Sequence, residues 1–209
     1  MPQTAQKQHY ARAPGTGSQV TSLVKEAKAG SRTAFEQLVD LFQEDIFRMV
    51  FYRTRSAMDA EDLAQDIFMQ AFKNLSGLKA VDRFRSWLYS IALNRVRDFN
   101  RKKRFRSLFY SFNDSHEVAQ AYAKTNDHHE ALDNLMIQDF WKQIGLLLDK
   151  LSRMEREVFL LRFMDHLSIK EISRVLEKSE STVKTHLYRA LQKFKREYSI
   201  LQLLQEVAP

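Results

Sequence analysis

The chain has 209 residues, 44% of them hydrophobic, which suffices for the core of one medium domain or two small ones. A formal net charge of +7 favours a polyanionic partner, such as nucleic acid, an acidic protein surface or anionic lipid. The chain has no cysteine, which excludes disulfides and cysteine-ligated zinc sites and suits a reducing cytosol.

No segment indicates export or membrane insertion. Residues 1–18 mix Gln, Lys, His, Pro and Gly and lack the apolar core of a secretory signal. No stretch approaches the ~18 uninterrupted apolar residues of a membrane span. We therefore expect a cytoplasmic protein without membrane insertion, whose residues 1–19 form a disordered tail.

The placement of proline predicts an all-α fold. Two of the three prolines lie in the first fourteen positions and the third is the last residue, so long helices can run between Thr16 and Ala208. Few segments carry the turn signals that bound β-strands.

Apolar residues at helical spacing predict a compact domain over residues 20–104. A first helix is expected over residues 20–30, and Ser31 then offers an N-cap for the second. The third helix should end at Ser76-Gly77, and the fourth should begin around Asp82 and run into a basic stretch. The apolar faces of the last three helices carry Phe35, Leu38, Phe42, Ile46, Met49, Leu63, Ile67, Phe68, Phe72, Phe84, Leu88 and Ile91.

The periodicity is then lost, so we expect a flexible linker over residues 105–130, followed by a second helical domain over 131–198 and a tail over 199–209. Two capping boxes mark helix starts in the second domain, each a serine followed three residues later by a glutamate. They are Ser152 with Glu155 and Ser168 with Glu171, and Ser179 offers a further N-cap.

The strongest functional pattern is a helix-turn-helix between residues 168 and 195. A short helix, a tight turn over residues 177–179 and a longer helix fit this motif, with small Ser173 where the helices would cross. The shared apolar seam would consist of Ile172, Leu176, Val183 and Leu187. Side chains that bond base edges and phosphates lie on the outward face of the longer helix: Lys184, Thr185, His186, Tyr188 and Arg189.

Two positions in the turn depart from the usual pattern. Helix-turn-helix proteins commonly carry glycine where Glu177 stands and an apolar residue where Lys178 stands. The plain alternative is an exposed amphipathic helix whose cationic end suits the helix dipole. The caps and the spacing together favour DNA binding.

A basic run covers residues 95–106, with Asp98 as its single acid. Basic side chains track phosphates, and aromatic side chains can stack on unpaired bases. Trp87 has helical spacing with Phe84 and Ile91, so we expect it in the core rather than as a stacking platform. The arginines are therefore the better nucleic-acid candidates.

An acidic face is expected on the third helix, where Asp62, Gln65, Asp66 and Met69 lie on one side. Acids early in a helix ordinarily interact with its dipole. In a protein of net charge +7 they also suit a docking surface.

These patterns together resemble the extracytoplasmic-function group of sigma-70 RNA polymerase sigma factors. Residues 59–68 (DAEDLAQDIF) and 84–94 (FRSWLYSIALN) look like region 2 of that family, and residues 151–195 are similar to its region 4. The resemblance implies a factor without enzymatic activity or cofactor that gives RNA polymerase its promoter specificity. It also implies an anti-sigma partner that masks both domains.

The resemblance further implies which residues meet which partner. The β′ clamp helices of core polymerase would be bound by Asp62, Gln65, Asp66, Phe68 and Met69. The melted −10 element of promoter DNA would be bound by Arg83, Arg85, Asn94, Arg97 and Arg101. The −35 element would be read by Ser181, Thr182, Lys184, Thr185, His186, Tyr188 and Arg189. The contact to the β-flap would include Leu160 and Phe163.

Two other readings remain. Residues 182–186 also suit the helix-turn-helix of LuxR-type regulators, although the N-terminal half then lacks the strands of a receiver domain. Asp127, His128, His129 and Glu130 would suit a metal site, but they fall in the expected linker with no second cluster at a suitable spacing.

Overall fold

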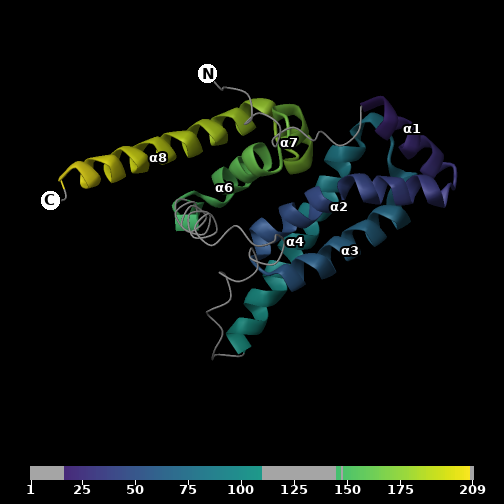
Figure 1. The fold of residues 1–209 in the computed structure, drawn as a ribbon, viewed down its shortest axis with the longest axis horizontal. Coiled ribbons are helices and arrows are strands. Elements are labelled where there is room, and N and C mark those ends of the chain that lie inside the picture. Colours follow the sequence, from purple (N-terminus) through teal and green to yellow (C-terminus); the bar gives the residue numbers. More distant parts are fainter. Residues whose placement is uncertain (1–16, 110–144, 147, 208–209) are drawn as a thin grey trace, which may run out of the picture.

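A computed structural model of the chain describes residues 17–109, 145–146 and 148–207. All regular elements in these residues are helical, which confirms the all-α prediction (Figure 1). The N-terminal half consists of α1 (Gly17–Lys28), α2 (Arg32–Thr54), α3 (Ala57–Asn74), two 3₁₀ turns (Leu75–Gly77 and Val81–Arg83) and α4 (Phe84–Phe109). The C-terminal half consists of α6 (Arg153–Phe159), a π-helical turn (Leu160–Met164), α7 (Ile169–Leu176) and α8 (Glu180–Val207).

The junction between α1 and α2 follows from Gly30 and Ser31. Gly30 has a φ of +102°, which glycine adopts without strain, and the chain can therefore turn directly after α1. Ser31 caps α2 as predicted, because its hydroxyl accepts a hydrogen bond from the amide of Ala34 at 3.2 Å. Helix α2 then packs against α1 and α3.

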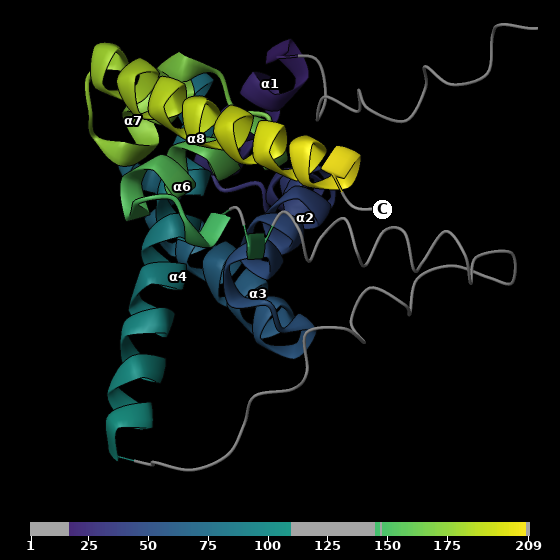
Figure 2. The same cartoon turned by 90° about the vertical axis from the view of Figure 1, so that its left-hand side faces the viewer.

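The fourth helix is longer than the sequence indicated. The segment around Asp82 forms a 3₁₀ turn, and α4 runs from Phe84 to Phe109, past the expected domain end at residue 104. Its last turns project from the body of the molecule (Figure 2). The basic run therefore begins as a continuation of the same helix that carries the apolar core residues Phe84 and Leu88.

Both predicted capping boxes are formed. The backbone amide of Ser152 donates to Glu155 at 2.9 Å, and that of Ser168 donates to Glu171 at 2.8 Å. Each glutamate amide donates in return to the serine hydroxyl. Ser179 caps α8 by accepting from the amide of Thr182 at 3.2 Å, so all three predicted caps are confirmed.

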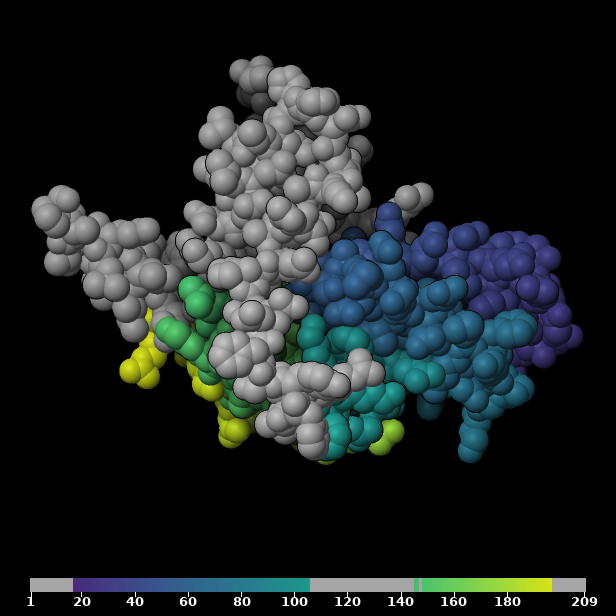
Figure 3. Space-filling view, turned by 90° about the horizontal axis from the view of Figure 1, so that it is seen from below, coloured from purple at the N-terminus to yellow at the C-terminus, as the bar shows by residue number. Residues whose placement is uncertain are grey.

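The two halves share one hydrophobic core. The buried cluster that contains Phe42, Leu88 and Tyr89 of the N-terminal half continues through Leu167 and Ile172 of the C-terminal half. Helix α7 packs directly on α4. In the space-filling view the purple-to-teal half adjoins the green-to-yellow half on one face (Figure 3). Within the described residues no helix is long and apolar enough to cross a membrane.

Candidate nucleic-acid interface

The helix-turn-helix is held together by the predicted seam. Ile172 and Val183 are almost fully buried, Leu176 is buried, and Leu187 packs partly buried against the same cluster. Ser173 does more than allow close approach, because its hydroxyl donates to the carbonyl of Lys178 at 2.6 Å. This bond ties α7 to the turn that leads into α8.

Glu177 stands in the turn where glycine is usual, and its backbone takes up a strained conformation. Glu177 ends α7 in the left-handed conformation, with a φ of +53°. Glycine adopts this conformation without steric penalty, whereas a residue with a Cβ does not. The amide of Glu177 still donates to the carbonyl of Arg174 at 3.3 Å, so the usual turn geometry is formed with an unusual residue.

The outward face of α8 carries the predicted −35 residues. Ser181, Lys184, Thr185, Tyr188 and Arg189 are exposed, while Thr182 and His186 are half-buried. Near the N-terminus of α8, Ser181 and Thr182 each share a hydrogen bond with Ser179 at 2.8 Å, and this network presets the first turn. The helix offers two cations, hydroxyls and an aromatic ring on one surface, which fits contact with DNA bases and phosphates.

The predicted −10 residues on the body of α4 lie on an accessible surface. Asn94 and Arg101 are exposed and Arg97 is half-buried. Arg101 pairs with Asp98 at 3.0 Å, but both side chains are largely in solvent, where such pairs are weak. Arg101 therefore remains available to a polyanion.

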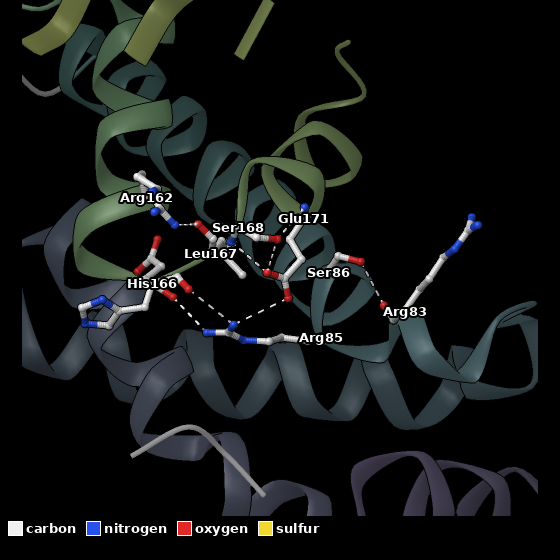
Figure 4. A network of polar contacts seen from close by, with 9 residues as sticks. Arg83, Arg85, Ser86, Arg162, His166, Leu167, Ser168 and Glu171 are labelled. Atoms are coloured by element: carbon white, nitrogen blue, oxygen red, sulfur yellow. Dashed lines mark hydrogen bonds and ion pairs between the residues drawn. The ribbon is translucent and has the colours of Figure 1, made fainter. Parts of the chain in front are cut away.

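Arg83 and Arg85, by contrast, point in different directions at the start of α4. Arg83 is exposed and its side chain extends away from the rest of the polar network (Figure 4). Arg85 turns toward the C-terminal half, where it donates to the carbonyl of Asp165 at 3.1 Å and of His166 at 3.5 Å. It also pairs with Glu171 at 3.6 Å. The structure therefore separates two residues that the sequence groups together.

The acidic face of α3 is present. Asp62, Gln65, Asp66 and Met69 are exposed, whereas Phe68 is 9% exposed and belongs to the core cluster. Phe68 can thus support the face from beneath but presents little surface of its own. Phe72, which the sequence places in the core, is 51% exposed and lies one turn beyond Met69. The sequence contains a signal for this exposure, because Phe72 follows Met69 by three residues and so continues the same helix face.

The two residues expected to meet the β-flap differ in exposure. Leu160 is buried, whereas Phe163 is exposed next to Phe159, with ring centroids 4.7 Å apart. Phe159 in turn stacks on Phe194 of α8 at 4.4 Å. This aromatic cluster fixes α6 to α8 and leaves one ring at the surface.

Trp87 lies partly buried against the core, with its ring 5.8 Å from that of Phe84, as the sequence predicts. Tyr89 is fully buried, and burial raises the pKa of its hydroxyl. The described residues contain no group of His, Asp and Glu that could hold a metal ion. The candidate metal residues 127–130 lie outside the described residues.

A buried ion cluster was missed by the sequence analysis. Arg53, at the end of α2, donates to Glu157 and to Asp165, each at 2.8 Å. The side chains of Arg53 and Asp165 are 4% and 1% exposed. Burial opposes the charge on Arg53, but the two carboxylates more than offset it and raise the pKa of Arg53. Burial also raises the pKa of Asp165, against the pull of Arg53. The partners are 104 and 112 residues away, so no local pattern signals this cluster.

Comparison with known protein families matches both halves. Residues 38–106 match the family described as sigma-70 region 2, and residues 141–194 match sigma-70, region 4. The chain is 30% identical to the ECF RNA polymerase sigma factor BldN of Streptomyces coelicolor, over 88% of this chain and 67% of that protein. It is 28% identical to the ECF sigma factor SigW of Bacillus subtilis, over 83% and 94% of the two chains.

Solved structures agree with this assignment. CnrH, in complex with the cytosolic domain of CnrY, superposes with a TM-score of 0.62 at 25% identity, covering 91% of this chain and 99% of CnrH. RpoE of Bartonella quintana, in complex with the anti-sigma factor NepR, shares the fold at 22% identity with a TM-score of 0.59, over 84% and 98% of the chains. The region 2 and region 4 matches, in this order, together with the relatives, show that the chain belongs to the extracytoplasmic-function group of RNA polymerase sigma factors.

Proposed function

We propose that this promoter-specific sigma factor divides its work between its two halves along the boundaries expected from the sequence, 20–104 and 131–198. The C-terminal half reads the −35 duplex and the N-terminal half binds core polymerase and the melted −10 strand. The observation that carries this proposal is the exposed, cationic face of α8. The N-terminal caps of α6, α7 and α8 are all formed and hold this face in place.

The −35 element would be read from the major groove by α8. Lys184 and Arg189 are exposed and suited to phosphates or guanine, and Ser181, Thr182, Thr185, His186 and Tyr188 would add base and backbone contacts. The capped start of α8 supports this role, because recognition helices contact bases through their N-terminal residues.

The −10 element would be bound in its unpaired state along α4, by Arg83, Arg85, Asn94, Arg97 and Arg101. A protein shifts the equilibrium between paired and unpaired DNA only if it binds the unpaired state more tightly. The cationic helix with adjacent aromatic residues is suited to a single strand, whose phosphates and base faces are both accessible.

Core polymerase would dock on the acidic face of α3, with Asp62, Gln65, Asp66 and Met69 at its surface and Phe68 beneath. Exposed Phe72 would extend this face by one turn. The exposed ring of Phe163 would contact the β-flap, with Leu160 supporting it from within.

The relatives support the proposal of an anti-sigma partner and a cytoplasmic location. CnrH is described in complex with the cytosolic domain of CnrY, and RpoE in complex with the anti-sigma factor NepR. We infer that this chain acts in the cytoplasm, performs no catalysis of its own and is held in check by a protein of the same class.

Reconstituted transcription tests the proposal. Core polymerase with and without the purified chain is offered a promoter library, and the transcription starts are mapped. We expect starts from a common −35 and −10 pattern that core polymerase alone ignores. A chain that fails to bind core polymerase, yet occupies duplex sites by itself, would contradict the proposal and favour a LuxR-type regulator.

A further inference from the structure

We propose that Met69 on α3 is an oxidation site that controls docking on core polymerase. Hydrogen peroxide converts its thioether to the sulfoxide, and the oxidised chain binds core polymerase more weakly. The inference rests on the proposed role of the acidic face of α3 and adds a chemical modification of one residue in that face.

The exposed methionines of the described residues are Met58 and Met69, and both lie on α3. The side chain of Met58 is 73% exposed and that of Met69 is 49% exposed. Met49 is fully buried, and Met154 and Met164 are half-buried. Because the sulfur must meet the oxidant in solution, Met58 and Met69 are the described methionines best placed to react.

The reaction needs no group other than the thioether and the oxidant. The chain has no cysteine, so no thiol of the same molecule competes for the peroxide. A lone pair on the methionine sulfur attacks one peroxide oxygen, the S–O bond forms and the O–O bond breaks. The sulfur is oxidised, the peroxide is reduced, and the leaving oxygen takes up the proton of the transferred one and departs as water. Peroxide is uncharged, so the exposed carboxylates of Asp62 and Asp66 do not repel it.

Met69 stands within the acidic face, whereas Met58 stands at its margin. Asp62, Gln65, Met69 and Phe72 follow one another by three or four residues and therefore share one side of α3. Met58 belongs to the same side, but it lies in the first turn of the helix, one turn before Asp62. The two methionines are thus both accessible to an oxidant and differ in their place relative to the proposed docking surface.

Met69 and Phe72 supply the apolar part of this face. The ring of Phe72 is 51% exposed and makes an edge-on contact with the ring of Phe35, with centroids 5.0 Å apart. This contact holds one apolar group in position at the surface, and Met69 lies one turn before it. Methionine and phenylalanine are enriched where protein interfaces are fully covered, and the flexible thioether adapts to the surface it meets. Core polymerase would therefore exclude water from Met69 when it docks.

A sulfoxide at position 69 changes the chemistry of that contact. Its oxygen is a hydrogen-bond acceptor, and it loses water when the interface forms. The neighbouring carboxylates of Asp62 and Asp66 are acceptors themselves and cannot donate to it. A polar oxygen that is buried without a donor should weaken binding by roughly tenfold or more. Oxidation of Met58 leaves the covered part of the face unchanged.

Peroxide treatment of the free, full-length chain tests the proposal. Catalase removes the excess oxidant before core polymerase is added, and peptide mapping by mass spectrometry measures the oxidation of each methionine. Fluorescence anisotropy of the chain, labelled at its N-terminus, gives the affinity for core polymerase. We expect the treated chain to bind at least roughly tenfold more weakly, and methionine sulfoxide reductases to restore the affinity.

Substitutions assign the effect to one sulfur. Met69→Leu removes the thioether and keeps an apolar side chain of similar size, and Met58→Leu is the matched control on the same helix. Each variant is compared with itself before and after treatment, once circular dichroism melts have established that it is folded. We expect Met69→Leu to retain its own affinity and Met58→Leu to lose as much as the unsubstituted chain. Met69→Gln introduces a permanent polar group and should bind more weakly without peroxide.

The rate of oxidation supplies an independent readout. Met69 should be oxidised more slowly in the holoenzyme than in the free chain, because core polymerase covers it. The protection of Met58 should be smaller. Equal rates at Met69 in the free chain and in the holoenzyme would overturn the inference, since the sulfur would then lie outside the interface.

The outcomes separate the oxidation site from the proposed function. Complete formation of the sulfoxide at Met69 with unchanged affinity would overturn the inference and leave the sigma function intact. The same holds if treated Met69→Leu loses as much affinity as the unsubstituted chain, because the sensitive group would then lie elsewhere. If the untreated chain does not bind core polymerase at all, the proposed function itself fails.

Discussion

Glu177 illustrates how a single residue can depart from a motif without destroying it. Its backbone adopts the left-handed conformation that usually selects glycine, and the hydrogen bonds around the turn are nevertheless formed. The energetic penalty is local, because Glu177 is exposed and its side chain has room to point into solvent.

Replacing Glu177 with glycine should therefore stabilise the protein. The left-handed conformation disfavours a residue with a Cβ by about 1–2 kcal/mol, and the greater chain entropy of unfolded glycine removes part of that gain. We expect Glu177→Gly to raise the free energy of unfolding by about 0.5–1 kcal/mol, as measured by urea denaturation. Glu180→Gly, at a helical position nearby, serves as the control and should destabilise the protein.

Glu155 is a second residue whose role is defined by its neighbours. Its carboxylate accepts a hydrogen bond from Lys193 of α8 at 2.7 Å and caps α6 through the amide of Ser152. The bond from Lys193 is the main cause of its lowered pKa, and the cap contributes further. Because the folded state has the lower pKa, the charged form stabilises the fold above the unfolded value of 4.5, and this stability is lost as the pH falls through the folded value.

Glu155→Gln should lower stability at neutral pH by about 1–2 kcal/mol, since it loses a charge-assisted bond and part of the capping box. As the pH falls below 4.5 toward the lowered pKa of folded Glu155, the stabilities of the variant and the unsubstituted protein should approach each other. Thermal melts at pH 7 and at pH 3.5 measure the difference. Glu36→Gln, on the exposed surface of α2, is the control and should leave the melts nearly unchanged. A constant gap at both pH values would contradict this assignment.

At the scale of elements, α8 is a capped helix with its apolar side on α6 and α7 and its cationic side in solvent. The two sides follow from one periodicity, since Val183, Leu187 and Ala190 recur at helical spacing between the polar residues. The same pattern that docks the helix therefore also orients its outward face.

Removing one cation from this face should weaken promoter binding in a salt-dependent way. If Lys184 or Arg189 contacts a phosphate, its alanine variant should reduce the slope of log affinity against log salt by about one. Fluorescence anisotropy of the holoenzyme on promoter duplex at several salt concentrations measures the slope. Arg32→Ala removes an exposed cation from α2 and should leave the slope unchanged. An equal slope in all variants would exclude α8 as the DNA-binding surface.

The 3₁₀ segment before α4 is anchored by α1, which lies outside the matched region 2. Lys28 of α1 donates from its ammonium group to the carbonyl of Leu78. Helix α1 also packs on both 3₁₀ turns. The contact places the loop that leads to Arg83 and Arg85.

Lys28→Met should therefore reduce promoter opening more than core binding. A hydrogen bond from a charged group contributes about 1.5–3 kcal/mol when buried, and this one is partly exposed, so we expect roughly tenfold less open complex. Permanganate reactivity of unpaired thymines measures the opening. Lys25→Met removes the same charge from an exposed position of the same helical turn and is the control. Equal effects of the two substitutions would show that only charge matters.

At the scale of the whole molecule, the larger of two buried clusters runs through both halves, and the smaller one lies within the C-terminal half. Burial of Leu167 and Ile172 against the N-terminal half couples the stability of α4 to that of the helix-turn-helix.

Truncating this shared core should destabilise both halves together. Ile172→Ala removes buried methyl groups and should lower the free energy of unfolding by about 2–5 kcal/mol. Hydrogen exchange followed by mass spectrometry should show faster exchange in α4 as well as in α8. Leu146→Ala, at an exposed position, should alter neither. Faster exchange confined to α7 and α8 would mean that the halves fold independently.

Much of the local structure was predictable from the chain. The caps at Ser31, Ser152 and Ser168 and the seam of the helix-turn-helix depend on residues three or four positions apart, and all are found. The partners of Arg53 and Arg85 and the inward turn of Phe68 were not predictable. They depend on which side of each helix meets a distant segment.

The sequence by itself thus determined the helical class, the helix starts, the helix-turn-helix and the family resemblance, because these follow from spacing along a short stretch of chain. Only the tertiary structure decided that the two halves pack together and that Arg85 faces Glu171 rather than solvent. The physical reason is that the sequence around a charged residue does not indicate which distant residue it will pair with. The partner is chosen when apolar burial brings segments about a hundred residues apart into contact.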